Sequence, residues 1–358
     1  MAELFSPLTI KEITLRNRIA VSPMCQYSSE DGFITDWHLV HLGSRAVGGA
    51  GLVIVEATAV SPEGRITPDD VGLWKEEHIA GLQRINTFLE SQGAVPGVQL
   101  AHAGRKASHR SPWNGGTAIA PSEERGWQTV APSALPFTPE EPVPTALDDA
   151  GIRKVIDDYR AATERAVRAG FKVVEIHAAH GYLLHEFYSP LSNQRTDSYG
   201  GSFDNRIRLL LEVTEAVQEV WPAKYPLLVR ISATDWTEGG WTGEDSIALA
   251  RVLKEKGVDL IDCSTGGNVP KADIPVGPLY QAQFAASLKK ETGIMTGAVG
   301  MITTAQEAEN LISEGKADIV LLAREMLRDP YFPLHAALEL GADVPWPVQY
   351  ERAKPRKR

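Results

Sequence analysis

Cysteine is scarce in this sequence. The 358 residues include two cysteines, Cys25 and Cys263, which are too few for a disulfide framework and fit a reducing compartment. Two thiols also argue against an iron–sulfur cluster, which usually takes four thiolate ligands. We therefore predict a cytoplasmic protein without such a cluster.

Long apolar runs and excess positive charge are lacking as well. No uninterrupted apolar stretch approaches the roughly 20 residues that cross a bilayer, and the first residues lack the charged start and apolar core of a signal peptide. Lys plus Arg number 36 and Asp plus Glu 46, a net charge of -10, which repels phosphate backbones and anionic membranes. We predict that neither nucleic acid nor a membrane is the partner. A basic tail is the exception, and a run like this at a terminus is usually solvated: Arg352, Lys354, Arg356, Lys357 and Arg358.

Short runs rich in Val, Ile and Leu recur along the whole chain and are nearly continuously apolar. This pattern is typical of parallel strands that helices cover on both faces. We predict eight strands, over residues 19–24, 52–58, 95–102, 173–179, 227–233, 260–265, 295–300 and 319–324.

Segments with helical spacing separate these strands, for example residues 76–93 and 147–170, where apolar residues return every three or four positions. Glycine stands just before the next strand at Gly93, Gly170, Gly257, Gly293 and Gly315, where a left-handed helix cap needs no β-carbon. Strand, helix and glycine repeated eight times favour an α/β fold, a single (β/α)8 TIM barrel formed by residues 1–358. An open doubly wound sheet is the alternative.

Three segments depart from the repeat. Residues 7–19 predict an N-terminal β-hairpin that closes the bottom of the barrel. Residues 104–146, after the third strand, carry seven prolines and no long periodic segment. A loop this long is usually functional, and we expect it over the carboxyl-terminal mouth of the barrel. Residues 345–358 form a C-terminal tail.

Active sites of barrels lie at the carboxyl ends of the strands. Polar residues end nearly every predicted strand, which indicates a large, polar, planar ligand. Arg324 opens the segment after the eighth strand and Gly300 ends the seventh, where barrels commonly hold a phosphate. A surface salt bridge is the alternative for Arg324.

The segment 177–185 contains His177, His180, Tyr182 and His185. A zinc site is one reading, but HExxH spacing and cysteine pairs are missing, so we predict no metal. Buried core histidines are a second reading. The third is a pair of imidazoles that grip one oxygen beside a phenol that keeps its proton at pH 7, which together polarise a carbonyl and deliver a proton.

At this point the sequence resembles the old yellow enzyme family of FMN-dependent ene-reductases, and more closely its thermophilic-like and xenobiotic reductase subclass. The resemblance covers essentially the whole chain. It rests on PLTIKEITLRNRI, VSPMCQYS, GRITPDD, QLAHAGRKA, VRISATD, GAVGMI, LAREMLRDP and PVQYER, and above all on HAAHGYLLHEFYSPLSNQRTDSYGGSFDNR.

The resemblance implies one FMN across the mouth of the barrel and assigns its contacts. Ser22, Pro23, Met24 and Cys25 match the stretch along the isoalloxazine ring. Cys25 matches a residue that adjusts the reduction potential of the flavin. The alternative is that Cys25 is simply a small buried apolar residue. The remaining cofactor positions are Ala57 and Gln99 at the pyrimidine side, Arg230 near N1 and the C2 oxygen, and Gly300, Ala323 and Arg324 at the phosphate. Most relatives carry glycine where this chain has Ala323.

The resemblance also implies the activity, an NADPH dehydrogenase that reduces activated C=C bonds of enones, enals, maleimides or nitroalkenes. NADPH or NADH gives a hydride to flavin N5, His177 and His180 hold the activating oxygen of the alkene, and Tyr182 protonates the α-carbon. Tyr27 matches a residue of the substrate pocket. Arg352 matches an arginine that reaches the neighbouring subunit's site, which implies a homodimer or homotetramer.

Two alternatives from other classes follow. A dienoyl-CoA reductase or amine dehydrogenase of related fold would carry a cysteine cluster and a further nucleotide-binding domain, which we do not expect here. A non-catalytic flavin-binding protein would hold the same cofactor without turning over an alkene.

Overall fold

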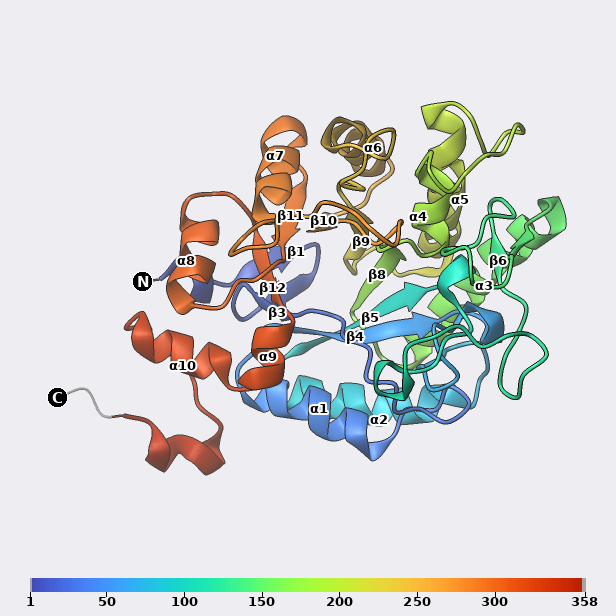
Figure 1. The fold of residues 1–358 in the computed structure, drawn as a ribbon. Helices are drawn as coiled ribbons and strands as arrows, with labels where there is room; N and C mark the ends of the chain where they lie inside the picture. Colours follow the sequence, from blue (N-terminus) through green and yellow to red (C-terminus); the bar gives the residue numbers. More distant parts are fainter. Residues whose placement is uncertain (1, 356–358) are drawn as a thin grey trace.

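A computed structural model describes residues 2–355 (Figure 1). Its centre is a closed barrel in which the neighbours along the sheet are β3-β4-β5-β8-β9-β10-β11-β12, all paired in parallel. The eight predicted strands are therefore confirmed as a (β/α)8 barrel. Their bounds are β3 Ile19–Val21, β4 Leu52–Ala59, β5 Val95–Ala101, β8 Val173–Ala178, β9 Leu227–Ser232, β10 Leu260–Ser264, β11 Met295–Ala298 and β12 Ile319–Leu322.

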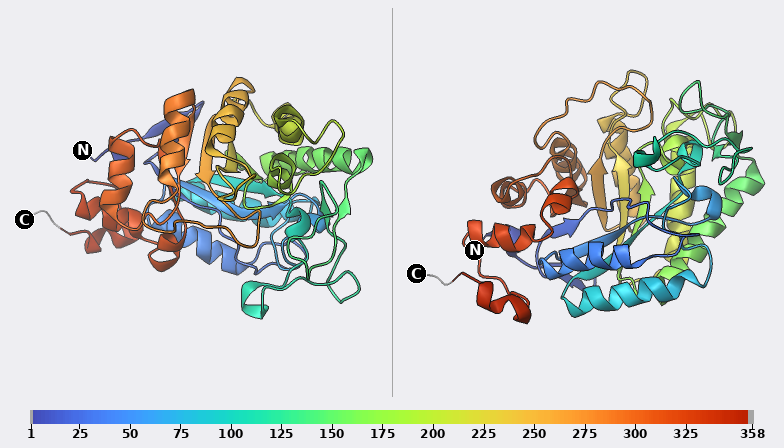
Figure 2. Two further views of the ribbon diagram at one scale, coloured as in Figure 1. Left: turned by 45° about the horizontal axis from the view of Figure 1, so that its top comes forward. Right: turned by 60° about the horizontal axis from the view of Figure 1, so that its bottom comes forward.

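Helices pack around the outside of the barrel (Figure 2). They are α1 Asp36–Val47, α2 His78–Ser91, α3 Asp149–Arg168, α4 Leu183–Tyr188, α5 Phe203–Val220, α6 Gly243–Glu255, α7 Ala282–Thr292, α8 Ala305–Ser313, α9 Arg324–Arg328 and α10 Phe332–Glu339. Short 3-10 turns add η1 Glu3–Phe5, η2 Pro62–Gly64, η3 Gly104–Lys106, η4 Pro112–Asn114 and η5 Val348–Ala353. The five predicted capping glycines all have positive φ, between 64° and 87°, as a left-handed cap requires.

The strands carry side chains of alternate residues to opposite faces, and both faces are buried. One apolar cluster fills the space between strands and helices, and a second fills the barrel itself, with Leu52, Ile54, Val173, Leu228 and Leu260 among its members. This double burial explains why the strand sequences are continuously apolar.

An N-terminal hairpin closes the amino-terminal end of the barrel, as predicted. Strands β1 (Leu8–Ile10) and β2 (Ile13–Leu15) pair antiparallel. Leu8, Ile10 and Leu15 are buried and belong to the cluster inside the barrel. The hairpin therefore covers apolar side chains at the end opposite the expected active site.

The extended loop after β5 is also confirmed. Residues 104–146 hold η3, η4 and two short strands that pair in parallel, β6 (Val130–Ala131) and β7 (Thr145–Ala146). Arg105 anchors the loop at the carboxyl-terminal end of the barrel: its Nη2 donates to the Asn268 carbonyl at 2.7 Å, and its backbone N–H donates to Glu186 of α4 at 2.9 Å.

Residues 345–355 of the C-terminal tail lie on the other side of the molecule from this loop (Figures 1 and 2). Residues 345–349 line a pocket of about 310 Å³ near the amino-terminal face, together with Arg16 after β2, Val47 and Gly49 at the end of α1, and Ser91 and Gln92 at the end of α2. Arg356, Lys357 and Arg358 of the predicted basic tail lie outside the described residues. Among residues 2–355, no helix combines the length and the apolar character that crossing a bilayer requires. The cytoplasmic location stays a prediction.

Candidate active site

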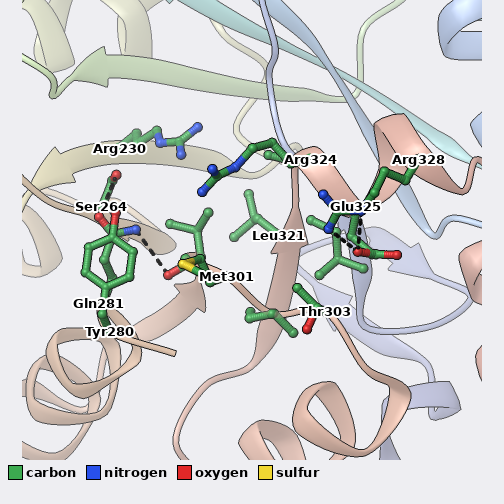
Figure 3. A pocket seen from close by; sticks show the side chains of 15 residues that line it. Arg230, Ser264, Tyr280, Gln281, Met301, Thr303, Leu321, Arg324, Glu325 and Arg328 are labelled. Carbon is green, nitrogen blue, oxygen red and sulfur yellow. Dashed lines mark hydrogen bonds and ion pairs between the residues drawn. The ribbon is translucent and has the colours of Figure 1, made fainter. Parts of the chain in front are cut away.

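A pocket of about 190 Å³ opens at the carboxyl ends of the strands β9 to β12 (Figure 3). Arg230 and Arg324 extend into it from opposite sides, so two guanidinium groups face one space. Gly300 and Ala323, which the resemblance assigns to the phosphate, contribute to its wall. The complete lining is Arg230, Ser264, Tyr280, Gln281, Val299, Gly300, Met301, Ile302, Thr303, Leu321, Leu322, Ala323, Arg324, Glu325 and Arg328.

Inside the barrel a polar layer lies above the apolar one. Residues two positions apart on a strand share a face, so each residue two beyond an apolar interior position also faces the interior. Strand β9 shows the change, with Leu228 in the apolar cluster and Arg230 in the polar layer. The buried polar residues found in this way are Ser22, Gln99, Glu175, Arg230 and Asp262. Three of the predicted cofactor residues are therefore neighbours in one layer.

Arg230 is held by Ser22, which directly follows β3, and by Asp262 of β10. Its Nη1 donates to Ser22 Oγ at 3.1 Å, and its Nε lies 3.2 Å from Asp262 Oδ2. In the strand register Arg230 pairs with His177 on one side and Asp262 on the other. Burial raises the pKa of Asp262, against the lowering effect of Arg230. The guanidinium is thus a fixed positive charge beside the histidine segment.

Strand β4 contains an irregularity that decides which side chain enters the site. Val55 pairs with Val98 and Ala57 with Gln99, which leaves Glu56 as an extra residue. Such a bulge re-aims side chains next to active sites. Glu56 accepts from the Gln26 backbone N–H and lies 2.9 Å from His38 Nε2 in α1, on the helix side. Ala57 takes the place beside Gln99.

The segment after β3 carries Ser22, Pro23, Met24, Cys25 and Tyr27, all of them buried or half-buried. Burial raises the pKa of the Cys25 thiol well above its usual value, and nearby Asp70 and Glu56 add to the effect. Cys25 is therefore a thiol and not a thiolate at neutral pH. Burial, followed by Cys25 and Tyr182, also raises the pKa of Tyr27.

The extended loop meets this segment at Tyr27. The Tyr27 and Trp113 rings pack edge to face at 5.7 Å, which brings η4 over the mouth. The predicted pocket residue Tyr27 therefore lies between the barrel and the loop.

His177, His180 and Tyr182 come together at the end of β8. The His177 ring packs edge-on against the His180 and Tyr182 rings, each at a centroid distance of 5.1 Å. Burial, and then Arg230, lowers the pKa of both imidazoles well below the usual value, so both are neutral. Burial raises the pKa of Tyr182, which keeps its proton. The three groups are neutral hydrogen-bonding groups in one cluster.

The histidines differ in their hydrogen bonds. His180 Nε2 lies 2.7 Å from Ser264 Oγ. His177 Nδ1 is buried, and among the described residues it has no hydrogen-bond partner. A buried polar atom without a partner costs about 1–3 kcal/mol, so this atom points to a bound group that would satisfy it.

Two residues at the site were not singled out from the sequence. Lys106 donates to the carbonyls of His180 at 2.7 Å and Gly267 at 2.9 Å, and its Nζ lies over the Tyr182 ring at 5.1 Å. Burial lowers its pKa to about 8. Lys106 belongs to the motif QLAHAGRKA, which is the one signal that could have found it. Gln281 lines the arginine pocket from the residue before α7, and no motif marks it.

Arg352 is not brought to this cluster. It is exposed in η5, whose first two residues line the pocket near the amino-terminal face. Its predicted role in a neighbouring subunit's site stays a prediction.

The donor set fits a phosphorylated, planar cofactor such as FMN. Arg324 and Arg230 supply positive charge for an anion and for an electron-rich ring edge, and the polar layer offers side-chain donors between them. His177, whose Nδ1 has no partner among the described residues, pairs with Arg230 in the strand register. Residues 3–342 match the sequence profile of the NADH:flavin oxidoreductase / NADH oxidase family.

The chain belongs to this family. It is 48% identical to the NADPH dehydrogenase of Bacillus velezensis over 353 residues, 98% of this chain and 99% of that protein. The NADPH dehydrogenase of Bacillus subtilis is also 48% identical, over 98% of each chain. The protein is therefore an FMN-dependent oxidoreductase with nicotinamide as its electron source.

Solved structures agree with the family. Morphinone reductase has a TM-score of 0.77 at 29% identity, covering 95% of this chain and 90% of that one. The old yellow enzyme homologue from Zymomonas mobilis has a TM-score of 0.77 at 28% identity, covering 96% and 94%. A 2-naphthoyl-CoA reductase complex has a TM-score of 0.85 at 28% identity, and there this chain spans 52% of the other. The resemblance to the old yellow enzyme family is confirmed.

Proposed function

We propose that this family member is an NAD(P)H-dependent ene-reductase in which the polar layer and the arginine pocket hold FMN. In this assignment Arg324, Gly300 and the Ala323 backbone hold the phosphate, and Arg230 faces the ring edge where negative charge collects on reduction. The remaining contacts fall to Ser22, Pro23, Met24, Cys25, Ala57 and Gln99. FMN, when bound, takes a hydride from NADPH or NADH and passes it to an electron-poor alkene.

The observation that carries the proposal is the cluster of two neutral imidazoles and a protonated phenol beside Arg230. Neutral His177 and His180 each offer an N–H to the carbonyl or nitro oxygen of the substrate. Those hydrogen bonds strengthen as negative charge builds on the oxygen, which lowers the barrier for attack at the β-carbon. Tyr182 then donates its O–H proton to the α-carbon. The product is a saturated ketone, aldehyde, imide or nitroalkane.

Tyr27 and the loop of residues 104–146 cover the substrate space in this proposal. We place all of this in one domain. Because Arg352 is not part of its own chain's cluster, we assign it to the site of a neighbouring copy of the chain. A homodimer or homotetramer supplies that neighbour.

The test is to purify the protein with FMN, bleach the yellow absorbance with NADPH under nitrogen, and add cyclohexenone. Return of the yellow band supports the proposal. Bleaching that cyclohexenone does not reverse, although ferricyanide does, would contradict the assignment as an ene-reductase and leave a flavoprotein with another acceptor.

A variant test addresses the three residues. Because a positioned general acid contributes about 100- to 10,000-fold, we expect Tyr182→Phe to slow the cyclohexenone step by at least 100-fold. The double variant His177→Ala/His180→Ala should lose cyclohexenone reduction and phenol binding while it retains flavin. Enone reduction at the wild-type rate in the double variant would refute the roles given to the histidines.

A further inference from the structure

His185 is the histidine of the 177–185 segment that the proposed reaction does not use. It is fully buried, and both ring nitrogens are hydrogen-bonded. The Gly181 backbone N–H donates to His185 Nδ1 at 2.9 Å, and His185 Nε2 lies 2.8 Å from Asp235 Oδ1. An N–H donated to Nδ1 requires a lone pair there, so the proton sits on Nε2 and is donated to Asp235. The pair has one defined arrangement.

Gly181 lies between His180 and Tyr182, and this turn is strained. His180 has a φ of 61° and Gly181 a φ of 74°, so two consecutive residues adopt the left-handed conformation. That conformation is costly for a histidine, and a side chain at Gly181 would collide with the Gly267 carbonyl oxygen. A turn of this kind persists only where its surroundings hold it.

The surroundings of Asp235 are rigid. Its Oδ2 accepts from Ser189 Oγ at 2.6 Å and from the Trp241 backbone N–H at 2.9 Å. Both oxygens of the carboxylate therefore interact with buried partners. Asp235 is a fixed point from which His185 reaches the turn.

The His185 ring is fixed from its face as well. It stacks on Tyr188 at 4.6 Å, with an angle of 26° between the rings. The Tyr188 hydroxyl donates to the Ala178 carbonyl at 2.8 Å, at the end of β8. Helix α4 is thus tied to the strand that carries His177.

A related arrangement occurs at a second helix that borders the site, where the histidine accepts from the N-cap residue itself and not from the residue before it. His38 of α1 accepts the Thr35 backbone N–H at Nδ1, 3.0 Å away, and its Nε2 lies 2.9 Å from the buried carboxylate of Glu56. In both helices the histidine is the third residue after the N-cap, Thr35 or Tyr182. A histidine in this position with a buried carboxylate behind it holds the backbone at the start of a helix.

We propose that His185 and Asp235 are positioning residues that set the placement of Tyr182 relative to His180, through the hydrogen bond from His185 Nδ1 to the Gly181 backbone. This inference rests on the proposed function. Tyr182 must reach the α-carbon of the substrate and His180 must reach its oxygen. These two residues stand on either side of Gly181. A shift of this peptide moves the two groups relative to each other, whereas the flavin-binding residues of the other strands stay in place.

Two amide substitutions separate the two hydrogen bonds. His185→Asn places a side-chain oxygen near the position of Nδ1, so it keeps an acceptor for Gly181 and loses Asp235. His185→Gln reaches the position of Nε2, so it keeps Asp235 and loses Gly181. In the holoenzyme reduced with NADPH, reoxidation by cyclohexenone is compared with reoxidation by ferricyanide, which accepts electrons without a carbon-bound proton. The ratio of the two rates is independent of the amount of folded protein.

We expect His185→Gln to lower this ratio about 10- to 100-fold, because small displacements of reacting groups cost rates of that order, and His185→Asn to lower it no more than about threefold. Asp235→Asn, which sets an amide NH₂ against the Trp241 N–H, should lower the ratio as well and decides the matter if His185→Gln does not fold. Thr214→Val is the control: it removes a buried hydrogen bond to Leu210 within α5 and should leave the ratio unchanged.

Equal ratios in His185→Gln, His185→Asn and the wild type would overturn the inference, as would an equal loss in both amide variants. A wild-type enzyme that cyclohexenone cannot reoxidise would instead contradict the proposed function itself.

Discussion

Burial decides which residues of the candidate site carry charge. It lowers the pKa of His177 and His180, so both imidazoles are neutral, and it raises the pKa of Tyr182, so the phenol keeps its proton. Arg230 lies beside them, with Asp262 at 3.2 Å and with Ser22 accepting one of its N–H groups. The cluster therefore combines neutral donors for a substrate with one fixed cation for an anionic ring.

The protonation state of Cys25 limits which interactions its side chain can make. Its raised pKa makes it a neutral thiol, which is a weak hydrogen-bond donor. If it lies at the flavin edge as proposed, Cys25→Ala removes a donor that stabilises the electron-rich reduced ring, and we expect a lower flavin midpoint potential, measured by dye-coupled reduction. Cys263→Ala, at a buried cysteine of β10, is the matched control. A potential that both variants leave unchanged would assign Cys25 to packing alone.

At the scale of elements, a single extra residue in β4 links the barrel to the segment that carries Cys25. Glu56 accepts from the Gln26 N–H, and Gln26 directly follows Cys25. Glu56→Gln places an NH₂ against either Gln26 N–H or His38. A buried donor without an acceptor costs about 1–3 kcal/mol. We therefore expect the dissociation constant of FMN to rise about 5- to 100-fold, measured by quenching of flavin fluorescence.

Asp318→Asn is the control for this prediction. Asp318 Oδ2 also accepts a strand N–H, that of Thr296, at 2.9 Å, but it does so at the amino-terminal end of the barrel. This variant should lower the melting temperature and leave FMN binding unchanged. An equal loss of FMN affinity in both variants would mean that general destabilisation, and not the anchoring of Gln26, weakens binding.

The sequence predicted elements better than it predicted the contacts between them. Continuous apolar runs identify buried parallel strands because both faces are covered, and the hairpin and the long loop follow from turn residues and proline. The bulge at Glu56 could not be predicted, since a run with one carboxylate reads the same with or without an extra residue. Lys106 and Gln281 reach the site through loop conformations that leave no periodic signal. His185 was noticed, but its partner Asp235 lies 50 positions away.

At the scale of the whole molecule, the polar layer and the turns around it contain buried carboxyl groups with raised pKa values. Burial raises the pKa of Glu186 to about 8, against the lowering effect of Arg105, and that of Asp70 to about 7. Glu175 is raised in the same direction by burial and by Asp262. These groups hold protons in the folded protein that an unfolded chain releases near pH 4.5. The barrel therefore gives up part of its stability at neutral pH to keep such groups inside.

This predicts a window of pH in which the protein without FMN becomes less stable. Between about pH 6.5 and 8 the folded state binds more protons than the unfolded chain, because unfolded carboxyls and histidines have already lost theirs. Stability then falls as pH rises, by up to about 1.4 kcal/mol per pH unit for each proton held. Below pH 6.5 unfolded histidines bind protons that the buried His177 and His180 do not, so these two groups make stability rise with pH. Above pH 8 the lowered pKa of Lys106 also makes stability rise with pH.

Glu186→Gln isolates one contributor to this window. The amide mimics the protonated carboxyl and can still accept the Arg105 N–H, so the melting temperature of the variant should lie closest to that of the wild type at pH 5 and exceed it by a margin that grows up to about pH 8. Calorimetric melting of both proteins from pH 5 to 9 measures the difference. Parallel curves across the whole range would show that Glu186 is already ionised in the folded protein. Glu186 would then be stabilised as an anion by Arg105 and Lys106, and its burial would cost the barrel no stability at neutral pH.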